Sequence, residues 1–147
     1  MRFFEEVQVA AFAFNLWRRR FARAVMSGRI EAIEAELGPG KKDEFSLWLE
    51  SCRETDRLKR SPTLAAVETI HAETRRLAGA ILECLKEGRQ DEALQLLGPD
   101  RAFSMLSHRL IVKLTHWKRH ALLRNLHRQM GRIGRQVRKT VAGAMTA

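Results

Sequence analysis

Apolar residues recur along this chain at intervals of three and four, the spacing that places side chains on one face of an α-helix. The first such stretch covers residues 4–26, and its charged residues fall largely outside the apolar stripe. The stripe consists of Val7, Ala10, Phe14, Trp17, Phe21 and Ala24. We therefore predict a long amphipathic helix that packs against the rest of the protein through this stripe.

Three further stretches with helical spacing precede residue 90. A wide apolar face covers residues 62–87, where Pro62 suits the first turn and either Ser61 or Thr63 can cap it. The segment "IEAIEAEL" predicts a short connecting helix, and the "GPG" at 38–40 should stop it. Residues 41–54 predict another helix, with four residues on one side: Phe45, Trp48, Leu49 and Cys52.

The last long helix is expected to begin after Asp100, which can serve as its N-cap, and to run to about residue 126 or beyond. A short helix in "DEALQLLG" precedes it. The apolar stripe of the last long helix is Phe103, Leu106, Leu110, Leu114, Trp117 and Ala121. Together these elements predict an all-α protein, an antiparallel four-helix bundle with short connecting helices and a basic C-terminal helical arm. We place the bundle at residues 1–121 and the arm at 122–147, with the tail "TVAGAMTA" disordered.

The net charge of +10 lies in the last third of the chain. Residues 101–147 contain 11 Lys and Arg and no Asp or Glu, whereas residues 1–100 contain 16 basic and 17 acidic residues. A new apolar stripe runs through the basic arm at spacings of 3, 4, 3 and 4: Leu123, Leu126, Met130, Ile133 and Val137. This stripe points roughly 120–150° away from the preceding one. We therefore expect it to miss the core of the bundle and to bind a partner.

Three kinds of partner could cover the arm. A protein helix, including one from a second copy of the chain, could pair along the apolar stripe, although two heptads with Gly131 and Gly134 are short for stable association. An anionic membrane surface could take the whole helix, a less favoured alternative. Nucleic acid could bind the basic residues through its phosphates. The residues expected to contact anions or nucleic acid are Arg119, Arg124, Arg128, Arg132, Arg135, Arg138 and Lys139.

Other features restrict the function classes. The apolar run near the N-terminus is interrupted by acidic residues, and no stretch reaches the roughly 18–20 apolar residues of a membrane span. Cys52 and Cys84 form no CxxC pair and favour a reduced, cytoplasmic setting. No GxSxG, P-loop, GxGxxG or HExxH motif occurs, so we expect no enzyme activity. Three histidines share one side of the last helix within a basic face that disfavours a metal: His116, His120 and His127.

Within this framework, "SPTLAAVETIHAETRRLAGAILECLKEGRQDEALQLL" followed by "FSMLSHRLIVKL" resembles the chemoreceptor zinc-binding domain family. The resemblance covers about residues 12–115. "NLWRRRFARAVMSGR" resembles the first helix of the family, "DEFSLWL" resembles its CxxGxW segment with Trp48 as the tryptophan, and Ser107 resembles its serine near the last helix. The resemblance implies a bacterial helical bundle of sensory origin that binds zinc through three histidines and a cysteine.

The zinc ligands match poorly. The family's first histidine falls on Phe14, or less well on Asn15, its cysteine falls on Asp43, and its HxxxH pair falls on His71 and Arg75. Phe14 has no donor atom, and an arginine is permanently protonated and repels a dication. We therefore expect no bound zinc, with His71 and Asp43 as the remaining ligand positions. An ion pair from Arg75 to Asp43, or to a nearby acid such as Glu68, would replace the metal.

These features predict a non-enzymatic regulatory or sensory-derived module that acts by protein–protein association, without zinc. The chain shows no receptor signalling segment and no cyclase domain, so we expect its output to pass through association. A nucleic-acid-binding regulator that uses the basic arm is the main alternative. A zinc-binding sensor with a different ligand set remains the third possibility.

Overall fold

The structure is a computed structural model that describes residues 1–38 and 41–146, with the backbone alone at 36–37. Every regular element in this part of the chain is helical, which confirms the all-α prediction. The stop expected at 38–40 falls partly on Pro39 and Gly40, outside the described residues. The elements are α1 (Phe3–Met26), α2 (Ile30–Ala32), the π-helical turn η1 (Ile33–Leu37), α3 (Glu44–Glu54), α4 (Pro62–Lys86), α5 (Gln90–Leu96) and α6 (Ala102–Thr146).

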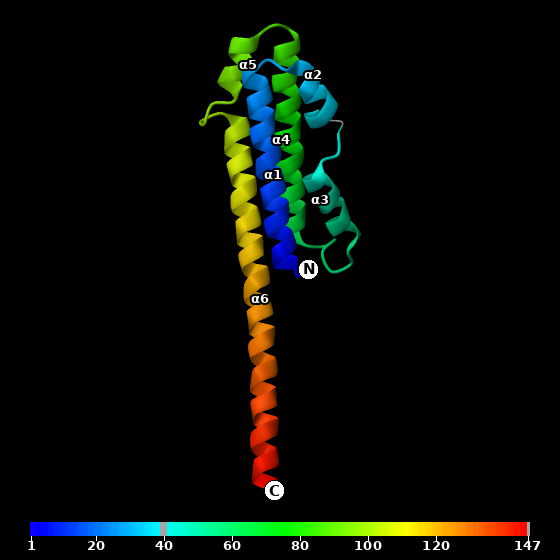
Figure 1. Cartoon of the computed structure of the whole chain (residues 1–147), viewed down its shortest axis with the longest axis vertical. Coiled ribbons are helices and arrows are strands. Elements are labelled where there is room, and N and C mark those ends of the chain that lie inside the picture. The colour runs from blue at the N-terminus through cyan, green and yellow to red at the C-terminus, as the bar shows by residue number, and fades with distance from the viewer. Residues whose placement is uncertain (39–40, 147) are drawn as a thin grey trace.

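The three longest helices pack together. Figure 1 shows α1 and α4 running in the same direction, with α6 returning along both of them in the opposite direction. The shorter α3 lies against α1 and α4. None of the helices in the described ranges combines the length and the apolar character that crossing a membrane requires.

The sequence of α1 explains its position in the core. All six residues of its predicted stripe, from Val7 to Ala24, are buried. The helix ends at Met26, and Gly28 follows with a φ of 65°, a left-handed conformation that glycine adopts without steric cost. Between these ends, the aromatic rings of Phe14, Trp17 and Phe21 stack along the interior.

Helix α4 begins where its sequence predicts, and the structure shows which of the two candidate residues, Ser61 or Thr63, is its N-cap. Ser61 is the N-cap, because its Oγ accepts a hydrogen bond from the backbone N–H of Leu64 at 3.3 Å. Pro62 occupies the first turn, where its missing N–H costs nothing. The helix ends before Gly88, whose φ is 76°. Its buried face includes two residues that can carry charge, His71 and Arg75.

Helix α6 corrects two expectations. It begins at Ala102, so Arg101 rather than Asp100 occupies the N-cap position. It also continues without interruption to Thr146, so the prediction of a disordered tail is wrong for 140–146, while Ala147 lies outside the described residues. The helix passes through Gly131, Gly134 and Gly143, because the surrounding Arg, Gln and Lys residues favour a helix.

The buried face of α6 ends at Trp117. Phe103, Leu110 and Leu114 pack into the core, together with Ser107, which is fully buried. Beyond Trp117 the same side of the helix carries Arg124, Arg128 and Arg132, counting about 100° per residue. Three arginines on successive helical turns cannot be buried without partners. The bundle therefore ends there, and α6 projects alone beyond it (Figure 1).

Candidate functional site

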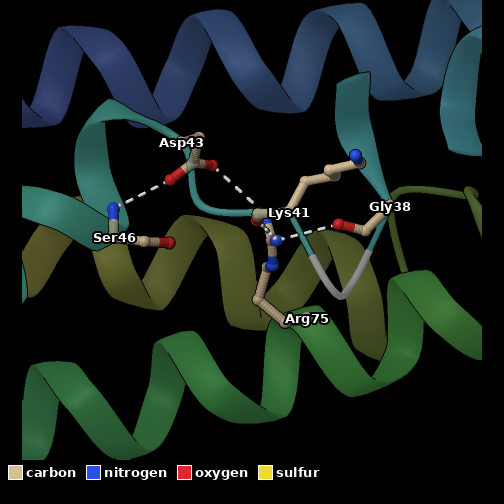
Figure 2. Close-up of polar contacts among 5 residues, drawn as sticks. All are labelled: Gly38, Lys41, Asp43, Ser46 and Arg75. Atoms are coloured by element: carbon tan, nitrogen blue, oxygen red, sulfur yellow. Dashed lines mark hydrogen bonds and ion pairs between the residues drawn. The ribbon is translucent and has the colours of Figure 1, made fainter. Parts of the chain in front are cut away.

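The interior of the bundle contains a buried arginine, Arg75 of α4, which makes polar contacts with Gly38, Lys41 and Asp43 before α3 (Figure 2). Its Nη1 donates to Oδ2 of Asp43 at 3.1 Å, and its Nη2 donates to the carbonyl oxygen of Gly38 at 3.0 Å and to that of Lys41. Its guanidinium also lies over the ring of Trp17 in α1, 5.1 Å from the ring centroid. Arg75 therefore cross-links α1, α4 and the segment that precedes α3.

Asp43 accepts hydrogen bonds from two different elements through its two carboxylate oxygens. One carboxylate oxygen, Oδ1, accepts the backbone N–H of Ser46 at 2.8 Å and so caps α3, while Oδ2 accepts from Arg75. The N-terminus of a helix carries a partial positive charge, which also favours the carboxylate. The start of α3 is thus fixed to the middle of α4 through one side chain.

His71 lies one helical turn before Arg75, on the same face of α4. Its ring meets the rings of Phe14 and Phe45 edge-on, with centroids 6.4 Å and 5.0 Å away. The pKa of His71 is lowered to about 4, chiefly by burial; the charge of Asp43 raises this pKa and the charge of Arg75 lowers it. Its Nε2 is buried without a hydrogen-bond partner in the described part of the chain. His71 is therefore held as a neutral imidazole among aromatic rings.

The residues of this cluster do not fit zinc. A structural zinc ion needs four N, S or O ligands in tetrahedral geometry. Phe14 presents a ring with no donor atom toward His71, and the guanidinium of Arg75 already takes the carboxylate of Asp43. Within residues 1–38 and 41–146, no three His, Cys, Asp or Glu side chains gather where they could hold a metal ion. The cluster can cross-link helices, but it offers no set of metal ligands.

The ion pair expected for Arg75 takes one of the two predicted forms. The pair with Asp43 is confirmed, whereas Glu68 pairs with the exposed Arg53 of α3 instead. The two backbone carbonyls that Arg75 also binds were not predicted, because their approach depends on the path of the chain between η1 and α3. Asn15, the weaker candidate for the first ligand position, accepts from Arg18 outside the cluster.

The chain was compared with known families and proteins. No known protein family, curated protein or solved structure matches it. The resemblance to the chemoreceptor zinc-binding domain family consequently stays a hypothesis that depends on the residues named above. The structure brings Phe14, Asp43 and the His71–Arg75 pair, which come from three separate segments of the sequence, into one cluster.

The arm of α6 presents its apolar stripe to solvent. Leu126 is 45% exposed, Met130 71% and Ile133 63%, and Leu123 and Val137 are similarly uncovered. None of the described residues beyond Trp117 in this helix is buried. The prediction that this stripe misses the core of the bundle is therefore confirmed, and the stripe is available to another molecule.

The basic residues of the arm lie mainly on the opposite side of the helix from the stripe. Arg124, Arg128, Arg132, Arg135 and Lys139 are all exposed, and each lies more than about 100° from the stripe, counting about 100° per residue. Arg119 is the exception, because it lies in line with the stripe one turn before Leu123. Arg138 lies at the border between the two faces. The arm is thus amphipathic, with an arginine-rich side directed away from the apolar one.

The remaining candidates occupy separate places. His116, His120 and His127 are all exposed on α6, among basic residues. Cys52 and Cys84 are buried, and burial raises the pKa of the Cys52 thiol to about 12, which suppresses the reactive thiolate. Cys52 therefore lacks the accessible thiolate of a catalytic nucleophile.

A pocket at the end of the bundle, where α6 leaves it, was not predicted. It has a volume of about 730 Å³ and lies between the start of α1, the connection from α3 to α4, and α6. Arginines from all three segments line it: Arg2, Arg57, Arg60, Arg124 and Arg128. Sequence analysis singled out Arg124 and Arg128, but no local pattern indicates that Arg2, Arg57 and Arg60 join them.

Proposed function

We propose that this protein is a non-enzymatic regulatory module that acts by protein–protein association through the arm of α6, without zinc. The observation that carries this proposal is the uncovered apolar stripe, Leu123 to Val137, on a helix that extends beyond its own bundle. Water-exposed apolar rows of this length mark contact surfaces in folded proteins. The resemblance to a sensory domain family supports the regulatory part of the proposal.

The heptad positions of the arm favour a second copy of this chain as the partner. In a heptad register with Leu123 at position a and Leu126 at position d, no Lys, Arg, Asp or Glu occupies the flanking e and g positions. The e and g residues are His127, Gln129, Gly134, Gln136, Val141 and Gly143. From Arg124 to Lys139 the basic residues fall at positions b, c and f, on the outside of a helix pair, whereas Arg119 falls at the preceding d position. Two copies can therefore approach along the stripe from Leu123 onward without bringing these outer basic residues together.

The expected association is reversible. An isolated segment of two to three heptads forms a helix only marginally in water. Here the arm continues a helix whose first half is fixed in the bundle, so pairing does not require a new helix to nucleate. Burial of five apolar side chains per copy favours the dimer, and the loss of translational and rotational freedom opposes it. The balance places the expected dissociation constant at ~1–100 µM.

The test compares oligomeric state across protein concentration. We expect sedimentation or light scattering to show the chain converting from monomer to dimer between about 1 and 200 µM. The double variant Leu126→Glu/Ile133→Glu should remain monomeric, because it places charge in the stripe. The matched control, Arg132→Gln/Arg135→Gln, makes the same change in net charge on the opposite side and should still dimerise. A wild-type chain that stays monomeric throughout, or a stripe variant that associates normally, would contradict the proposal.

A second function is favoured by one specific observation, the row of basic residues that faces away from the stripe. Nucleic acid could bind Arg128, Arg132 and Arg135 through its phosphates, and affinity would then fall steeply with salt. Gel-shift measurements on the full chain and on a chain truncated after Ala121 test this alternative. The truncation leaves every buried residue of α6 in place, so the bundle should still fold. Unchanged binding by the truncated chain would exclude the arm as a nucleic-acid contact.

A further inference from the structure

The pocket at the arm end of the bundle combines charges that come from distant parts of the chain. Figure 1 shows the N-terminus and the connection from α3 to α4 at the end of the bundle where α6 departs. Arg2 lies at the start of α1, Arg57 and Arg60 lie in the connection, and Arg124 and Arg128 lie on α6. Glu6 is the one carboxylate that lines the pocket. The pocket is therefore strongly positive.

These five arginines form no ion pair with the residues that the structure describes. At the opposite end of the bundle, Lys86 pairs with Glu34 and Arg89 pairs with Glu87 and Glu92. Some other basic residues in the described ranges also form no ion pair, but here five arginines from three segments line one concave surface. A concave surface of one sign concentrates counter-ions.

Two helix ends add to the positive potential. α1 and α4, with 24 and 25 residues, both start at the pocket, where Phe3, Phe4 and Thr63 contribute to its lining. The first backbone N–H groups of a helix have no partner inside it, and they point along the helix axis toward any anion at its start. Guanidinium groups bind phosphate in a forked, bidentate geometry.

Apolar residues also line the pocket, beside the polar side chains of Ser61, Thr63, His120 and Asn125. Leu58 and Trp117 line it, and the ring of Phe3 meets the ring of Trp117 edge-on at 5.1 Å between centroids. The volume falls within the range of small-molecule sites, about 300–1,000 Å³. A ligand with several negative charges therefore matches the arginines of this pocket better than a single small ion does. A ring on that ligand could in addition contact the apolar residues.

We propose that this pocket binds a phosphate-bearing small molecule, either a nucleotide or an inorganic polyphosphate. The phosphates lie against Arg57, Arg60 and Arg128, and the base of a nucleotide contacts Phe3 and Trp117. The proposal does not rest on dimerisation through the arm, because Arg57 and Arg60 lie outside α6. A bound anion also neutralises the repulsion among the five arginines, so it raises the stability of the bundle end from which the arm departs.

Titration calorimetry on the full-length chain at physiological salt tests the proposal, with ATP and tripolyphosphate as separate probes. We expect saturable binding of at least one probe, together with a rise in Tm. The variant Arg57→Gln/Arg60→Gln should weaken that binding by roughly 10- to 100-fold. The control Arg19→Gln/Arg20→Gln removes the same charge from exposed positions of α1 outside the pocket and should bind like the wild type.

The two probes distinguish the sources of phosphate. Tighter binding of ATP than of tripolyphosphate assigns the site to nucleotides, and equal or weaker binding of ATP assigns it to inorganic polyphosphate. No binding of either probe at millimolar concentration overturns the proposal, as does an equal loss of affinity in the pocket variant and in the control. Because both variants change exposed side chains, circular dichroism should show the same fold for each. The oligomeric state measured for the arm is expected to be independent of either result.

Discussion

The buried imidazole of His71 should make the stability of the bundle depend on pH. Replacing His71 by Leu keeps an apolar side chain of similar size between Phe14 and Phe45 and removes the titrating group. Burial lowers the pKa of His71 from 6.5 to about 4 in the folded state. Between these two values the unfolded chain binds a proton that the folded chain does not. Folding stability contributed by this residue is therefore complete above pH 6.5 and is lost as the pH falls toward 4.

The size of the effect follows from the shift. With a pKa of about 4 folded and 6.5 unfolded, the free energy of unfolding decreases by about 2 kcal/mol between pH 8 and pH 5, and by about 3 kcal/mol once both forms are protonated. Asp43 raises the pKa and so opposes part of the shift, while the guanidinium of Arg75 adds to it. The interval from pH 5 to pH 8 isolates the histidine, since most carboxylates stay ionised above pH 5.

Urea unfolding at pH 5 and pH 8 measures this difference, because the free energy of unfolding extrapolates linearly at constant m. The wild type should lose about 2 kcal/mol more than the His71→Leu variant between the two pH values. A control variant at an exposed histidine of α6, His108→Leu, should retain the loss seen in the wild type. Equal pH dependence in the wild type and in His71→Leu would refute the reasoning and show that the imidazole is not held neutral by burial.

Four other outcomes follow from the same structure. Arg75→Met should destabilise the bundle by about 3–5 kcal/mol in urea unfolding, because it leaves Asp43 and two backbone carbonyls without their donor. Asp43→Ala should cost about 1 kcal/mol more than Asp43→Asn, which keeps the cap of α3 and loses only the charge. The triple variant Phe14→His/Asp43→Cys/Arg75→His should bind zinc stoichiometrically by metal analysis if the family resemblance is correct, and a folded variant without zinc would contradict it. Gly134→Ala should raise the helicity of the arm by circular dichroism and stabilise it by about 1 kcal/mol, since its added Cβ meets open space.

The helices could be predicted because each depends on its own local pattern. The stripe from Val7 to Ala24 and the Ser61–Pro62 start of α4 are signals that no tertiary contact contradicts. The prediction of a disordered tail failed because it relied on position in the chain and not on the local pattern. Terminal residues are usually disordered, but here the helix has no stop signal in "TVAGAMTA" other than Gly143, and a single glycine costs only about 1 kcal/mol.

The buried cluster was predictable in part. Residues at i and i+4 on α4 must share a face, so a buried His71 implies a buried or half-buried Arg75, and a buried arginine requires an acid. That requirement limits the choice of partner without deciding it, and the choice of Asp43 over Glu68 depends on how α3 is placed against α4. The carbonyls of Gly38 and Lys41 complete the coordination of the guanidinium, and they belong to a connection whose path has no periodic signal.

The arm-end pocket shows why charge in a sequence and charge in a structure differ. Arg2, Arg57, Arg60 and Arg128 are each typical surface residues in their own segments, and nothing in the spacing of any one segment brings them together. Their convergence follows from topology. α1 and α4 start at the same end of the bundle, and α6 runs in the opposite direction to both. The contact between Phe3 and Trp117 sets the register of α6 against α1. That register determines which residues of α6 lie beside the two helix starts. Helix packing that buries the aromatic residues therefore also assembles the arginines. A fold with the same helices but a reversed α6 would keep the net charge of +10 and lose the pocket.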